Sequence, residues 1–193
     1  MHYFVEGIKL TEIEYNCLLH IKADPEGWLL DAIAEKAKLR RTALISEWQP
    51  KLFADASVTE LPASEAETCA LIMARSDYTT RLEQDAAQDP PVVATRHSIV
   101  KFESVSREST VTLFPSGIDT ADVDANCILA YVQYLDEWIM GALMGMVNRG
   151  KKKMLAQYHP IIMADASVTT MPATEDGLIT MILARSDYQR LGS

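Results

Sequence analysis

The sequence lacks the features that mark membrane and secreted proteins. It has no uninterrupted apolar run of the roughly 18–20 residues that a membrane span requires. Its N-terminus shows no basic-then-apolar signal pattern. The 3 cysteines form no Cys-x-x-Cys pair and lie among leucine and isoleucine, which is typical of buried thiols in a reducing compartment. We therefore expect a soluble protein that is made in the cytoplasm and has no membrane partner.

Positive charge and catalytic motifs are also scarce. The 18 lysines and arginines are outnumbered by 27 acidic residues, giving a net charge of -9, which argues against nucleic acid as a partner. The histidines share no metal-ligand spacing, and no Walker loop, nucleophile elbow or Gly-x-Gly-x-x-Gly motif occurs. We predict that the chain is not an enzyme and has no catalytic residue, metal site or cofactor.

What the sequence does contain is a repeat. The stretch Ala-Asp-Ala-Ser-Val-Thr occupies residues 54–59 and 164–169, and Ala-Arg-Ser-Asp-Tyr occupies residues 74–78 and 184–188. The difference in numbering between the two copies, which we call the repeat offset, is the same for both pairs, so no gap intervenes and an internal duplication is indicated. The predicted organisation is a first repeat over residues 1–83, a bridge over 84–110 and a second repeat over 111–193.

The period is longer than the 20–50 residues that are typical of solenoids and propellers. We therefore predict two similar units related by a pseudo-two-fold, as in a dimer fused into one chain. A unit of about 80 residues is only marginally stable alone, so we expect the two units to share one core.

Local signals predict the same elements in each repeat. Residues 3–10 favour a β-hairpin turning at Gly7, Thr11 with Glu14 forms a capping box, and Asp24 caps a second helix that ends near Trp48 before Pro50. A third helix, capped at residue 64, is predicted to extend past residue 78. The bridge is rich in β-branched residues over 92–105, which favours one or two strands. The predicted fold class is α+β, mainly α, with two tandem copies of a hairpin plus three helices joined by a partly extended bridge.

The repeated loop and third helix supply the first candidate site. It consists of two equivalent sets of four residues, namely Asp55, Arg75, Asp77 and Tyr78, and Asp165, Arg185, Asp187 and Tyr188. The functional interpretation is a polar site formed by Arg75 and Asp77 and present twice. On a helix, however, the arginine would point away from the aspartate two positions later. The structural interpretation is that each arginine binds the loop aspartate and holds loop to helix.

A second candidate site is the helix around the second repeat's tryptophan, which is apolar nearly all round. Such a helix is either a central core helix or part of an intersubunit contact. The candidate interface residues are Trp138, Met140, Gly141, Met144 and Gly145, followed by the basic group Arg149, Lys151, Lys152 and Lys153. The basic group is either a solvated helix face or a docking patch for an acidic partner.

The motif Asp-Pro-Glu-Gly-Trp at residues 24–28, a long helix and the loop Ala-Asp-Ala-Ser-Val-Thr-x-Leu-Pro together carry a family resemblance. The first repeat, from Glu12 to Glu83, resembles small helical proteins that tailed bacteriophages and prophages encode, commonly in structural or tail gene modules. The second repeat has Leu135 where the family would have proline, but keeps Trp138 and Pro172. The resemblance implies a phage particle or assembly context and no catalytic residues.

Three functional hypotheses follow. The first is a bacteriophage virion or assembly protein that is made in the host cytoplasm, forms a homo-oligomer and binds other virion or assembly proteins. The second is a soluble cytoplasmic regulator or inhibitor that binds a host protein. The third is an unrecognised enzyme or ligand-binding domain, which would require a concave pocket with convergent polar groups. Arg75 or Arg185 in the lining of such a pocket would favour it.

Overall fold

The computed structural model describes residues 2–5, 7–88 and 110–190. It confirms a mainly helical fold, with 61% helix and 7% strand. The elements in chain order are β1 (His2–Val5), β2 (Ile8–Thr11), α1 (Glu12–Leu19), α2 (Pro25–Ala54), α3 (Glu65–Met73), α4 (Arg81–Ala86), β3 (Thr110–Leu113), β4 (Ile118–Ala121), α5 (Asp122–Leu129), α6 (Leu135–Ala164) and α7 (Glu175–Leu183).

The predicted helix starts are confirmed at three caps. The Thr11 hydroxyl accepts a hydrogen bond from the Glu14 N–H, and the Glu14 carboxylate accepts one in return from the Thr11 N–H. Asp24 accepts from the Gly27 N–H at 2.9 Å, and the Ser64 side chain accepts from the backbone N–H at the start of α3. Side-chain oxygens at these positions satisfy N–H groups that have no partner within the helix.

The helix ends differ from the prediction. Helix α2 continues through Pro50 to Ala54, and α6 continues through its own proline. A proline in a helix removes one hydrogen bond, but the buried Leu52 anchors the turn that follows. Conversely, α3 ends at Met73, and an unpredicted short helix, α4, begins after a capping box at Thr80.

The strands are antiparallel, but the predicted hairpin at residues 3–10 is wrong. Strand β1 pairs with β4, and β2 pairs with β3, so each strand has its partner in the other half of the chain. At position 7 a glycine permits a close approach, because a Cβ there would stand 2.8 Å from the Phe114 carbonyl oxygen. The strands predicted within residues 92–105 lie outside the described residues.

The chain forms two compact units, and each draws on both halves of the sequence. The first unit contains β1, α2 from Leu30 onward, α3, α4, β4, α5 and the first turn of α6. The second contains β2, α1, the first turn of α2, β3, α6 from Met140 onward and α7. The two long helices pass from one unit to the other at Leu30 and Met140, and these two residues are themselves related by the repeat offset.

We call residues 7–29 head 1 and residues 117–139 head 2. Residues 30–88 are body 1, and residues 140–190 are body 2. Head 2 belongs to the same compact unit as body 1, and head 1 belongs to the same unit as body 2. Each head thus packs on the body that lies in the other half of the chain.

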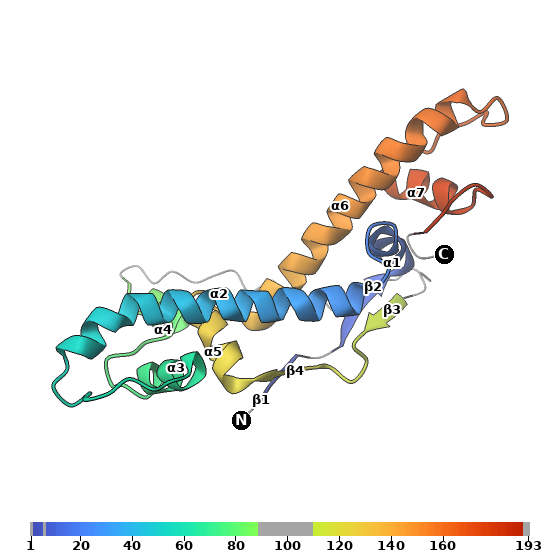
Figure 1. Cartoon of the computed structure of the whole chain (residues 1–193). Helices are drawn as coiled ribbons and strands as arrows, with labels where there is room; N and C mark the ends of the chain where they lie inside the picture. Colours follow the sequence, from blue (N-terminus) through green and yellow to red (C-terminus); the bar gives the residue numbers. More distant parts are fainter. Residues whose placement is uncertain (1, 6, 89–109, 191–193) are drawn as a thin grey trace. The chain divides into compact units, whose positions relative to one another are not determined.

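The core of the first unit lies between α2, α3 and α5, which are side by side in Figure 1. Its buried members come from body 1 and head 2, namely Leu44, Trp48, Leu52, Cys69, Ile72, Cys127 and Ala130. The second unit packs α1 against α7 and α6 (Figure 1), with Cys17, Leu18, Leu143, Met154, Ile162, Ile179 and Ile182 buried. The interior of each unit is therefore completed by a head.

Candidate functional site at the two loop–helix ends

Each long helix ends in a loop that turns on an aspartate. In the first unit Asp55 Oδ1 accepts hydrogen bonds from the Ser57 N–H at 2.9 Å and from the Ser57 hydroxyl at 2.6 Å. In the second unit Asp165 accepts the same two bonds from Ser167, at 3.0 and 2.6 Å. Such aspartate turns let a loop bond its own backbone, so the repeated sequence gives the same local conformation twice.

An arginine braces the loop in the first unit. Arg75 Nη1 donates to Asp55 Oδ2 at 2.7 Å, which is the loop-to-helix pairing that the sequence suggested. Arg75 Nε also donates to Asp77 Oδ1 at 2.9 Å, although we expected these side chains to point apart. That expectation was wrong because α3 ends at Met73, so both residues lie in a turn rather than on a helix.

The second unit has the same brace with one further bond. Arg185 Nη1 donates to Asp165 at 2.9 Å, while Nε and Nη2 donate to the two oxygens of Asp187 at 2.7 and 2.9 Å. The Ser167 hydrogen bonds, with the Arg185 guanidinium, lower the pKa of Asp165 to about 2. The carboxylate is thus ionised at neutral pH, which strengthens hydrogen bonds that the charged form accepts.

Aromatic rings lie near each brace. Tyr78 and Tyr188 belong to the predicted sets, whereas their partners Trp48 and Tyr158 were not predicted to be part of the site. The Trp48 and Tyr78 rings are 6.0 Å apart, and the Arg75 guanidinium lies 6.0 Å from the Trp48 ring. In the second unit the rings of Tyr158 and Tyr188 are 5.7 Å apart. The signal was present, because positions 48 and 158 are both aromatic and are related by the repeat offset.

The braced ends also expose large apolar side chains. Phe53 is 67% exposed in the last turn of α2, and Met163 is 64% exposed in the last turn of α6. Each follows a buried residue, Leu52 or Ile162, and the repeat offset again relates the two positions. The second unit additionally exposes Met171 in the loop itself. Each end therefore offers an apolar side chain beside a braced loop.

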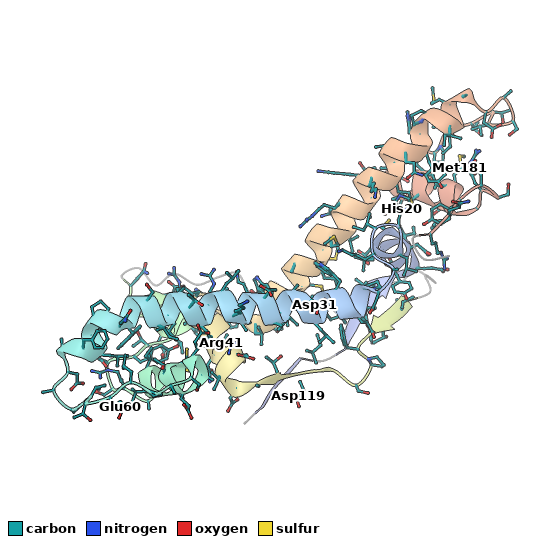
Figure 2. All side chains as sticks on the ribbon, in the orientation of Figure 1. His20, Asp31, Arg41, Glu60, Asp119 and Met181 are labelled. Carbon is teal, nitrogen blue, oxygen red and sulfur yellow. The ribbon has the colours of Figure 1, made fainter. Side chains whose placement is uncertain are left out.

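A shallow depression of about 310 Å³ lies beside the second brace. Its lining residues are Asp165, Ser167, Val168, Thr169, Thr170, Met181, Ala184 and Arg185; Met181 on α7 is labelled in Figure 2. Arg185 is among the lining residues that the ligand-binding hypothesis named. Its guanidinium is nevertheless engaged by the two aspartates, so its main role here is to brace the loop.

The predicted interface helix buries only part of its apolar surface. Ile139, Leu143 and Val147 are buried, whereas Trp138, Met140, Met144 and Gly145 are half-buried and Gly141 is exposed. Lys36 Nζ lies 5.3 Å from the Trp138 ring centre, within the first unit. Apart from the adjacent residues and the backbone of the same helix, no described atom would come within 4 Å of a Cβ at Gly141 or Gly145. No other described element therefore packs closely on these two candidate interface glycines.

The predicted basic group lies within α6, and its residues differ in their contacts. Lys151 Nζ binds Asp176 at 2.8 Å within the second unit. Arg149, Lys152 and Lys153 are exposed. These three exposed positive charges are those that a docking patch for an acidic partner would present.

The Cys17 thiol is buried. Burial raises the pKa of the Cys17 thiol to about 11, so it is protonated at neutral pH. Within residues 2–5, 7–88 and 110–190, no three His, Cys, Asp or Glu side chains are grouped to hold a metal ion. The same ranges contain no helix with the length and apolar character for crossing a membrane.

Comparisons of the chain with protein-family models, curated proteins and solved structures find no match.

Proposed function

We propose that the chain is a protein–protein interaction module of a bacteriophage virion or of its assembly, with two similar but unequal binding ends. The observation that carries the proposal is the pair of braced loop–helix ends that expose Phe53 and Met163. The phage context comes from the family resemblance of the first repeat. In this proposal the partners are other virion or assembly proteins and further copies of the chain, and no catalysis is involved.

The architecture we propose for this role is an internal duplication with a pseudo-two-fold. Its support is that the repeat offset relates α1 to α5, α2 to α6 and α3 to α7, with equal lengths in each pair. The points at which the two long helices pass between units are related in the same way. A fused dimer of this kind carries two copies of one binding end, which can then diverge.

The ends are suited to binding for a physical reason. Exposed phenylalanine and methionine give the apolar contact area that commonly dominates interface energies. The arginine brace fixes the loop beside each of them, which lowers the entropy lost on association. Met163 and the nearby Met171 adapt to an irregular partner surface more readily than Phe53 does, so we expect the two ends to bind different surfaces.

Two experiments test the proposal. Mass spectrometry of purified particles should detect the protein in a fixed copy number, and its absence would refute a virion role. In the phage, Phe53→Ser and Met163→Ser should each reduce incorporation roughly 10-fold or more, as expected when an interface anchor is removed. Leu39→Ser is the matched control, because Leu39 is 65% exposed on α2 and lies well before the loop that follows this helix. Normal incorporation of both end variants would refute the assignment of the binding ends.

A further inference from the structure

We infer that the two heads are not interchangeable, so that each body accepts only the head of the other repeat. This inference rests on the duplication proposed above and not on the assembly role. It concerns an interaction surface whose partner is a defined segment of the same chain, or the same segment of a second copy. The residues that determine it are those at which head and body meet and the two units differ.

The sharpest difference is Gly150 in body 2. A Cβ at this position would overlap the backbone carbonyl of Cys17 in head 1, so α1 approaches α6 as closely as a glycine permits. The equivalent position in body 1 is Arg40, whose guanidinium lies 4.5 Å from the Tyr131 ring of head 2. Head 1 cannot dock on body 1 in its native position, because the Arg40 side chain would occupy the place of its backbone.

A second difference is the size of one head side chain and of the aromatic body side chain near it, both of which differ between the two units. His20, which ends head 1's helix and is only 4% exposed, packs between Tyr158 and Tyr188 with ring centres 6.2 and 5.9 Å away. His20 is labelled in Figure 2 where α1 meets α6 and α7. In the first unit the equivalent head residue is Ala130, which lies in the same buried cluster as Trp48.

The larger head residue, His20, therefore meets the smaller ring, that of Tyr158. The smaller head residue, Ala130, lies in the cluster with the larger ring, that of Trp48. Docking head 1 on body 1 would bring His20 against Trp48 and overpack a filled core. Docking head 2 on body 2 would set Ala130 against Tyr158 and leave a cavity. Both mismatched pairings are disfavoured, by opposite steric errors.

Charge does not make this distinction. Asp124 of head 2 lies 3.5 Å from Arg41 of body 1, the residue labelled in Figure 2. The equivalent residues in the second unit are Glu14 of head 1 and Lys151 of body 2, again an acid and a base. Because both heads are acidic and both bodies basic at this point, the selection is carried by shape.

The first test is Gly150→Ala in the full chain, followed by hydrogen–deuterium exchange of each helix. Alanine favours a helix more than glycine does, so a purely local effect would be stabilising. We expect instead that amides of α1 exchange at least about tenfold faster as head 1 loses its docking, while α5 is unchanged. Gly145→Ala is the matched control on the same helix, because its Cβ would meet no described atom beyond the adjacent residues and the backbone of its own helix. Unchanged protection of α1 in Gly150→Ala would overturn the inference.

The second test exchanges residues 12–24 with residues 122–134, which are equal in length. We expect both relocated helices to lose protection, or the chain to pair with a second copy through matching heads and bodies. The four changes Arg40→Gly, Trp48→Tyr, Gly150→Arg and Tyr158→Trp should then restore native protection and mass. If the exchanged chain keeps native protection and mass, or if the four changes fail to restore them, the inference is wrong. Neither result bears on particle association, so the proposed function is tested separately.

Discussion

Replacing Leu18 with alanine should destabilise the second unit, although Leu18 lies in the first half of the chain. Leu18 is fully buried in α1. Removing a buried leucine side chain costs about 3 kcal/mol, within the range of roughly 2–5 kcal/mol for such sites. Helix α1 has 8 residues and is too short to be stable without packing, so the cost falls on its docking to body 2. A loss of about 3 kcal/mol shifts the docking equilibrium by more than about a hundredfold.

Hydrogen–deuterium exchange resolved by segment measures this effect. In Leu18→Ala we expect faster exchange in α1, in α7 and in α6 beyond Met140, with little change in α3 and α5. Ile128→Ala is the matched variant, because Ile128 is the equivalent, fully buried residue of α5, and it should loosen α3 and α5 instead. If Leu18→Ala loosened body 1 and left body 2 protected, the assignment of head 1 to the second unit would be wrong.

Three further predictions follow from the second unit's polar groups. Burial and the nearby Lys153 lower the pKa of His20 below 6.5. As the pH falls, the unfolded chain therefore binds a proton at this histidine before the folded chain does. Thermal denaturation should show stability falling as the pH drops below about 6.5. His20→Ala should remove that pH dependence, because the variant has no imidazole to titrate at this position. Alanine is chosen because it is the native residue at the equivalent position 130. The pKa of Asp165 is about 2 instead of 3.8, so its stabilisation persists at neutral pH and should be lost only as pH falls from about 4 towards 2. Arg185→Met should weaken that acid dependence and speed amide exchange in residues 165–172, whereas Lys152→Met, at an exposed position of α6, should do neither.

The parts of the fold that the sequence predicted are those that local chemistry controls. Thr11, Asp24 and Ser64 sit where a side-chain oxygen can cap a helix, and each does so. The aspartate turns and their arginine partners were also readable, because Asp55 and Arg75 recur together at the repeat offset. The contact of Arg75 with Asp77 was missed because it depends on where α3 stops, and no glycine or proline marks that end.

The parts that could not be predicted depend on which distant segments meet. Pro50 suggested a helix end, but buried contacts of the following turn outweigh the lost hydrogen bond. The hairpin prediction failed for a similar reason. Two short extended segments next to each other in sequence look like a hairpin, yet β1 and β2 each find a partner in the other half of the chain. Periodicity and turn signals describe one segment at a time and do not specify that choice.

Each head packs on the body in the other half of the chain, and alignment of the two repeats shows a sequence pattern that indicates this pairing. If each head docked on its own body, His20 would face Trp48, and Ala130 would face Tyr158, so a large residue would meet the larger ring. Across the repeats the same four residues match in size, and Gly150 lies opposite the head that approaches most closely. Differences between two copies that compensate only across the copies indicate that the copies pack on each other. In a duplicated chain, the positions at which the repeats disagree therefore carry the information about pairing that their agreement cannot supply.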